Sequence, residues 1–220
     1  MKTVLTAVCS AALLSTVAGA ATVGVDDSSA PWLGFMNVFE LDGTSFIFGS
    51  SWGIADLNAS FDDGAGTLTM SPNTIGDPDP FWYIGGGGPG AQGNKIMEAN
   101  LYQQVDDDSL AGQTVTFEGV VLSNTFTAAH EARLFIRDFA PDYSSVNEVF
   151  IDAVDGAFSF SLLTDAGLGR HVQWGLQVKG ENVWFTDTAP FGSVTLGTIP
   201  APGSLALLGL GGLVATRRRR

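Results

Sequence analysis

Hydrophobic and polar residues alternate over several short stretches in the middle of this 220-residue chain. The clearest of these are Thr114–Glu118, Ala157–Leu162 and His171–Val178. Because side chains on a strand point alternately to opposite faces, a period of two over about four to eight residues predicts a strand with one buried face. Weaker patterns of the same kind predict strands at Gly34–Glu40, Ser45–Phe48, Gly66–Met70, Phe81–Ile84, Asn100–Val105, Ala132–Phe139, Asn147–Ile151, Asn182–Thr186 and Gly192–Leu196.

Turn-forming residues separate these stretches, as in Asp62-Asp63-Gly64, Asp155-Gly156 and Gly180-Glu181-Asn182. The sequence between residues 21 and 198 carries no apolar stripe of a long helix. About twelve short strands joined by tight turns predict an all-β fold, an antiparallel β-sandwich. Within that class we expect a jelly roll, flanked by an N-terminal signal helix and a short C-terminal hydrophobic helix.

The first 20 residues have the pattern of a secretory signal peptide. Lys2 provides the positive end, Val4–Leu14 is mostly apolar, and Ala18-Gly19-Ala20 fits the small residues that precede cleavage. The only cysteine, Cys9, lies in this segment. We therefore expect a mature chain without disulfides, whose β-sandwich domain spans residues 21–198.

The last 22 residues, 199–220, have three parts. Pro200, Ala201 and Pro202 form a stiff spacer, and residues 203–215 are apolar. This apolar run is shorter than the roughly 20 residues that span a bilayer as a helix. The chain then ends in a cationic cluster that favours the cytoplasmic side of a membrane. The cluster consists of Arg217, Arg218, Arg219 and Arg220.

This C-terminal arrangement resembles the PEP-CTERM sorting signal of Gram-negative bacteria that form exopolysaccharides, with Ala201 in place of the family's glutamate. The resemblance implies export and transient inner-membrane anchoring through the C-terminal helix. It also implies recognition and cleavage by an exosortase-type membrane protease. The destination would lie between the periplasm and the outer cell surface or extracellular matrix.

The central domain differs from both ends of the chain in its charge. Residues 21–198 contain five of the ten cations and all 23 acids, a net charge of −18 against −13 for the whole chain. Such a field repels nucleic acids and anionic membranes, so neither is an expected partner. It also suits calcium, which prefers carboxylate oxygens, as a possible structural ion. The acids that we single out as its ligands are Asp26, Asp42, Asp77 and Asp79.

The central domain resembles the galactose-binding-like jelly rolls of carbohydrate-binding modules. The residues that carry the resemblance are Leu101–Val105, Leu110–Phe117, Gly156–Phe160, Val172–Gln177 and Gly192–Leu196. The closing Asp-x-Val pattern of that family is replaced by Gly192-Ser193-Val194. The resemblance implies the sandwich architecture and glycan binding.

Motifs for catalysis lack the context that they need. Gly49-Ser50-Ser51-Trp52-Gly53 matches the nucleophile elbow of hydrolases, but no parallel sheet with a following helix is predicted around it. The glycine-rich segment 85–93 is not followed by the helix of a dinucleotide-binding site. We therefore expect a protein without catalytic activity.

Aromatic residues are the remaining candidates for binding, because sugar rings stack on them. We expect Trp174, Phe117, Phe158 and Phe160 to be buried. On a strand, Trp82 and Tyr83 would face opposite sides, leaving one of them exposed. The predicted sugar-binding residues are Trp82, Tyr83, Trp184, Gln92 and Asn94.

These features together predict an exported, surface-sorted protein that binds glycans in an extracellular polysaccharide matrix. An alternative is a structural matrix or surface-layer protein whose acidic face makes calcium-bridged contacts. A third hypothesis is a glycan-active hydrolase, which would need two carboxylates on either side of a sugar.

Overall fold

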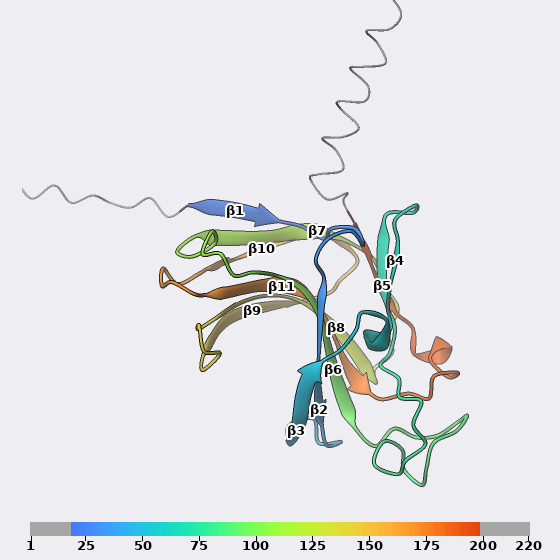
Figure 1. The fold of residues 1–220 in the computed structure, drawn as a ribbon. Helices are drawn as coiled ribbons and strands as arrows, with labels where there is room; N and C mark the ends of the chain where they lie inside the picture. Colours follow the sequence, from blue (N-terminus) through green and yellow to red (C-terminus); the bar gives the residue numbers. More distant parts are fainter. Residues whose placement is uncertain (1–18, 199–220) are drawn as a thin grey trace, which may run out of the picture.

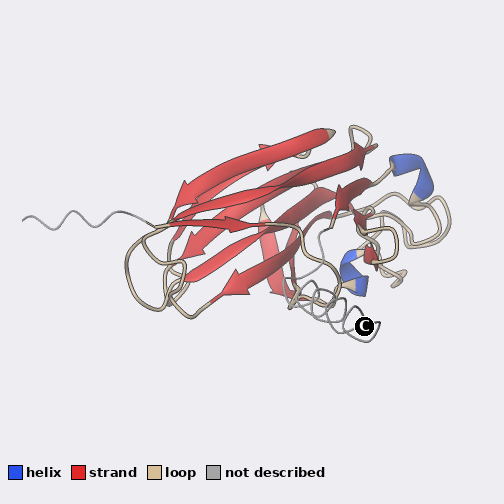
Figure 2. Ribbon diagram, turned by 90° about the horizontal axis from the view of Figure 1, so that it is seen from above, coloured by secondary structure: helices blue, strands red, loops and turns tan. Residues whose placement is uncertain are grey.

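Two β-sheets lie face to face in the computed structural model, which describes residues 19–198 (Figures 1 and 2). The predicted sorting signal and all but the last two residues of the predicted signal peptide lie outside the described residues. Two single-turn helices, η1 (Ala55–Leu57) and η2 (Ala189–Phe191), lie in connections between strands. The predicted all-β sandwich is confirmed, and its layering is compatible with a jelly roll.

One of the two sheets is called the β11 sheet, after its longest strand. Its strands run in the order β3-β2-β6-β11-β8-β9, and every neighbouring pair is antiparallel. Their bounds are β2 (Leu33–Phe39), β3 (Phe46–Ser51), β6 (Ile96–Val105), β8 (His130–Phe139), β9 (Val146–Asp152) and β11 (His171–Glu181).

The second sheet, named the β7 sheet, has the order β1-β7-β12-β5-β4, with β10 also paired to β7. Strand β1 pairs with β7 in parallel, which is a departure from the predicted antiparallel arrangement. The chain changes sheet after β1, β3, β5, β6, β7, β9, β10 and β11. The bounds are β1 (Ala20–Val23), β4 (Ala59–Asp62), β5 (Thr67–Met70), β7 (Thr114–Asn124), β10 (Gly156–Leu163) and β12 (Val194–Gly197).

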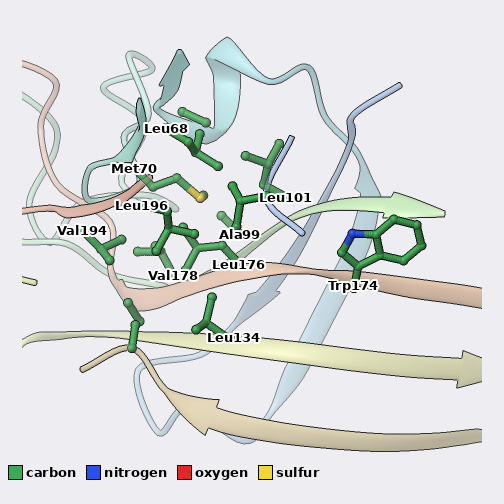
Figure 3. Close-up of a cluster of buried hydrophobic side chains, with 14 of the residues drawn as sticks. Leu68, Met70, Ala99, Leu101, Leu134, Trp174, Leu176, Val178, Val194 and Leu196 are labelled. Atoms are coloured by element: carbon green, nitrogen blue, oxygen red, sulfur yellow. The ribbon is translucent and has the colours of Figure 1, made fainter. Parts of the chain in front are cut away.

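The core lies between the sheets, where the inward-facing residues of each strand meet (Figure 3). Trp174 lies at one end of the labelled cluster, is 6% exposed, and donates its indole N–H to the Gly24 carbonyl at 3.2 Å. Phe117 is fully buried, and Phe158 and Phe160 pack their edges against it. The predicted burial of Trp174 and Phe117 is confirmed, while Phe158 and Phe160 are only half-buried because β10 is an edge strand.

Two of the predicted strands are wrong. Phe81–Ile84 is a turn, because the Asp79 carboxylate accepts the Phe81 N–H at 2.7 Å and the Asp79 carbonyl accepts the Trp82 N–H at 2.9 Å. Asn182–Thr186 makes only a single bridge, between Val183 and Thr74, before the chain turns. Around Asp79 local groups satisfy the backbone in place of a neighbouring strand. In the second segment the N–H groups of Asn182 and Val183 donate to the distant carbonyls of Lys95 and Asn73.

Candidate functional site

Two of the three predicted sugar-binding rings pack against each other at one end of the sandwich. Tyr83 is fully buried, and its hydroxyl donates to the Ile75 carbonyl at 2.5 Å. Trp184 meets the Tyr83 ring edge-on, with centroids 5.4 Å apart. The glycine-rich segment covers this pair so closely that a Cβ on Gly87 would lie 2.6 Å from the Trp184 ring. These two rings therefore hold the segment in place.

The other predicted sugar-binding residues lie nearby on the same segment. Trp82 is half-buried between Phe48 and Phe81, at 6.2 and 4.7 Å. The Asn94 amide donates to the carbonyls of Pro80 and Phe81, whereas Gln92 is exposed. Sugar binding by these residues stays a prediction.

The four acids predicted to bind calcium serve different local purposes. Asp77 and Asp79 accept backbone N–H groups within their own turn. Asp42 accepts from Thr44 and Ser45, and these hydrogen bonds, chiefly those from Ser45, lower its pKa. Burial raises the pKa of Asp26, partly offset by a hydrogen bond from Gln103. Within residues 19–198, no group of three or more acidic, histidine or cysteine side chains converges as a metal site.

The outer face of the β11 sheet carries a groove of about 570 Å³. Strands β2, β3, β6, β8, β9 and β11 supply its residues, together with the turn between β8 and β9. The lining combines aromatic rings, amides and one ion pair. Its residues are Phe35, Asn37, Ser51, Asn100, Tyr102, Arg137, Phe139, Tyr143, Val146, Glu148 and Gln173.

Gly175 marks the middle of the sheet beneath this groove. It pairs with Tyr102 on one side and Phe135 on the other. A Cβ at this position would lie 2.1 Å from the Leu101 carbonyl oxygen and 2.8 Å from the Tyr102 Cα. Only glycine allows the backbone of β6 and β11 to approach this closely.

Arg137 is the central charged group of the groove. Its guanidinium lies over the Phe135 ring, 4.2 Å from the centroid, and 5.1 Å from that of Phe150. It donates to Glu148 Oε2 at 3.1 Å and to Asn100 Oδ1 at 2.9 Å. Burial lowers the pKa of Arg137, opposed by the charges of Glu148 and Glu98, and a guanidinium stays protonated under such a shift.

Amide groups continue the polar lining of the groove on either side of Arg137. Asn100 Oδ1 also accepts the Gln177 amide at 2.9 Å, and Gln173 donates to Gln104 Oε1 at 2.6 Å. Among the described lining residues, Glu148 is the one carboxylate and Arg137 the one cation. The groove therefore offers a nearly neutral set of donors and acceptors between aromatic rings.

Two tyrosines give the groove its exposed aromatic surface. Tyr102 lies on β6 and is half-buried, and burial raises the pKa of its hydroxyl. Tyr143 lies in the turn between β8 and β9, is 52% exposed, and has a φ of 57°. A left-handed backbone is uncommon for an aromatic residue and is often found at functional sites.

Sequence reasoning missed this groove, although part of its signal was present. Asn100, Tyr102 and Gln104 alternate with buried residues along β6, so they share the outer face. Arg137 likewise lies between buried residues of β8, on the same outer face of the sheet. Joining the two sets required the strand order, which local alternation does not contain.

Comparison with known proteins identifies one feature. Residues 198–220 match the PEP-CTERM protein-sorting motif, which confirms the predicted C-terminal signal and marks this as an exported, surface-sorted chain. The motif implies processing by exosortase, a membrane protease. No curated protein matches the chain with significant similarity. Within residues 19–198, no helix is long and apolar enough to cross a membrane.

Proposed function

We propose that this surface-sorted chain is a non-catalytic protein of a Gram-negative-type bacterium that binds neutral glycans of an extracellular polysaccharide matrix through the groove of the β11 sheet. The observation that supports the proposal is the combination of Phe35, Tyr102, Phe139 and Tyr143 with amide and charged groups in one hollow. Sugars place their C–H faces on such rings, while their hydroxyls bond to polar groups between them.

The charge of the groove favours an uncharged sugar. Arg137 is already paired with Glu148, so no free cation in the lining is available for a uronic acid. The net charge of −18 on residues 21–198 adds a long-range repulsion against acidic polymers. A neutral polysaccharide meets neither obstacle.

The presence of a single carboxylate in the described lining of the groove favours binding over hydrolysis. Glycosidases flank the scissile bond with two carboxyl groups about 5–10 Å apart. Glu148 is the one carboxylate in the described lining, and nearby Glu98 is held by Asn37 at 2.9 Å and by Lys179 at 3.7 Å. We therefore assign the chain a binding role.

The test is retention of the purified protein in gels containing a neutral glucan, galactan or mannan, with a polyuronate as the acidic comparison. A stacked ring contributes about 1–2 kcal/mol, so Tyr102→Ala should weaken binding by roughly tenfold. Trp82→Ala, which removes the predicted ring outside the groove, is the matched control and should retain wild-type binding. Thermal unfolding of each variant shows whether the fold is intact.

Other outcomes would redirect the proposal. Loss of retention with Trp82→Ala alone would move the site to the segment around Trp82. Preference for the polyuronate would contradict the neutral ligand. Release of reducing sugar would favour the hydrolase. Absence of retention by any polymer would favour the structural role, and the next measurement would then be whether calcium makes the protein self-associate.

A further inference from the structure

We infer that the imidazolium of His171 is a positioning group that holds the Tyr143 ring at the rim of the groove, so that glycan binding weakens when His171 loses its proton. The effect on glycan binding rests on the proposed function. The contact between the side chains of His171 and Tyr143 does not, and it can be tested without any ligand.

The turn that carries Tyr143 is short and strained. The Ala140 N–H donates to the Ser145 carbonyl at 2.9 Å, and the Tyr143 N–H donates to the Ala140 carbonyl at 2.9 Å. Tyr143 adopts its left-handed conformation at the tip, with its ring 5.4 Å from Phe139. Such strain persists where surrounding contacts hold the residue in place.

His171, the first residue of β11, supplies those contacts. Its ring stacks on Tyr143 with centroids 4.2 Å apart and planes 9° from parallel. Its Nε2 lies 3.2 Å from the Pro141 carbonyl oxygen, in the same turn as Tyr143. Its Nδ1 lies 2.6 Å from Asp106 Oδ1, just beyond the end of β6.

Both partners of the imidazole are acceptors. A carbonyl has no proton to donate, so Nε2 must carry a hydrogen to bond Pro141. Burial acts to raise the pKa of Asp106, but hydrogen bonds from Gln104 and His171 outweigh it and lower this pKa, which keeps Asp106 ionised. Nδ1 must then carry a hydrogen too, and a ring with two N–H groups is the imidazolium.

The other charged groups around His171 have partners of their own. Arg170, its chain neighbour, pairs with Asp138 at 2.8 Å and with Asp165 at 3.0 Å. Tyr102 and Arg137 lie on this side of β6 and β8, and Asp107 adjoins Asp106. Asp142, next to Tyr143 in the turn, accepts the Ser144 N–H at 3.1 Å. Asp106 therefore provides the direct ion pair of His171.

Loss of the His171 proton should weaken the contacts that hold the Tyr143 ring. The neutral ring has one N–H and can satisfy only one of Asp106 and Pro141. It also loses the attraction of a cation for the Tyr143 ring. The ring of Tyr143 should therefore be held while the imidazolium persists and released when its proton is lost.

Nuclear magnetic resonance of tyrosine-labelled protein tests the structural half. The chain has three tyrosines and two histidines, so each ring signal can be assigned with Tyr143→Phe and Tyr102→Phe. The Tyr143 signal should shift between pH 5 and 8 with the midpoint of the His171 imidazole signal, and His171→Gln should abolish the shift. The buried Tyr83 ring is the internal reference. A Tyr143 signal that does not follow His171 overturns the inference.

Binding of the neutral polysaccharide at several pH values tests the functional half. Wild-type affinity should fall about three- to tenfold from pH 5.5 to 8, and His171→Gln should bind weakly at both. His130→Gln is the matched control, since burial lowers the pKa of His130 and its Nε2 bonds the Glu181 carbonyl away from the groove. It should retain the wild-type profile.

The resonance and binding experiments together show which of the two proposals fails. If the Tyr143 signal follows His171 but no glycan binds, the proposed function fails and the positioning role stands. If glycan binds with the same affinity at all pH values, the regulatory role of His171 is overturned while the binding function remains.

Discussion

Two arginines of β8 show how surroundings set the value of an ion pair. Arg133 pairs with Glu131 and Asp152, and its side chain is 40% exposed. Arg137 pairs with Glu148, but its side chain is 12% exposed and also bonds Asn100 over the Phe135 ring. Water screens the first pair, whereas the second is held in a desolvated network.

Substitution of Arg137 should therefore cost more stability than substitution of Arg133. We expect Arg137→Ala to lower the free energy of unfolding by about 2–3 kcal/mol, because hydrogen bonds to a charged group and ring contacts are lost together. Arg133→Ala should change it by about 0.5 kcal/mol or less. Urea unfolding of the purified variants measures both, and equal effects would contradict the central role of Arg137.

At the scale of elements, β11 is the strand that joins core and groove. Trp174, Leu176 and Val178 face the β7 sheet, while Gln173, Gly175 and Gln177 face the groove. Most of its residues are buried, so both faces are covered. Its alternation nevertheless remained readable because the groove face is polar.

The core face of β11 can be tested at Trp174. Trp174→Ala should lower the free energy of unfolding by about 3–5 kcal/mol, through lost burial and the cavity left behind. Leu168→Ala, just before β11, removes a side chain that is 80% exposed and should have an effect near zero. A small effect at Trp174 in thermal unfolding would mean that its face of β11 is not tightly packed.

The whole molecule combines an acidic domain with a cationic C-terminal end. Residues 21–198 carry −18, whereas all four terminal residues are arginines. Terminal arginines hold a chain end on the cytoplasmic side of a membrane during export. Sorting therefore depends on a segment separate from the groove that we propose to bind glycan.

Replacing Arg217–Arg220 by serine should block processing in a host that has an exosortase. Unprocessed precursor should accumulate with the membranes, and the surface fraction should fall, as measured by immunoblotting of cell fractions. Lysine at the same four positions keeps the positive charge and should retain more processing. Unchanged release of the serine variant would contradict a role for these arginines.

The strands that sequence predicted well are those with regular alternation. Ala157–Leu162 and His171–Val178 lie inside β10 and β11. Phe81–Ile84 failed because hydrogen bonds around Asp79 form a turn, which a short apolar run does not reveal. β1 and β4 were not predicted, and β1 begins at Ala20, the last residue of the predicted signal peptide.

The sequence by itself determined the all-β class, the buried face of β11 and the C-terminal sorting motif, because each depends on residues close together in the chain. Tertiary structure decided the candidate site. Tyr102, Arg137 and Tyr143 meet because β11 lies between β6 and β8, and because the turn after β8 brings Tyr143 onto His171. Strand order follows from packing of the whole chain, so no local pattern could assemble this groove.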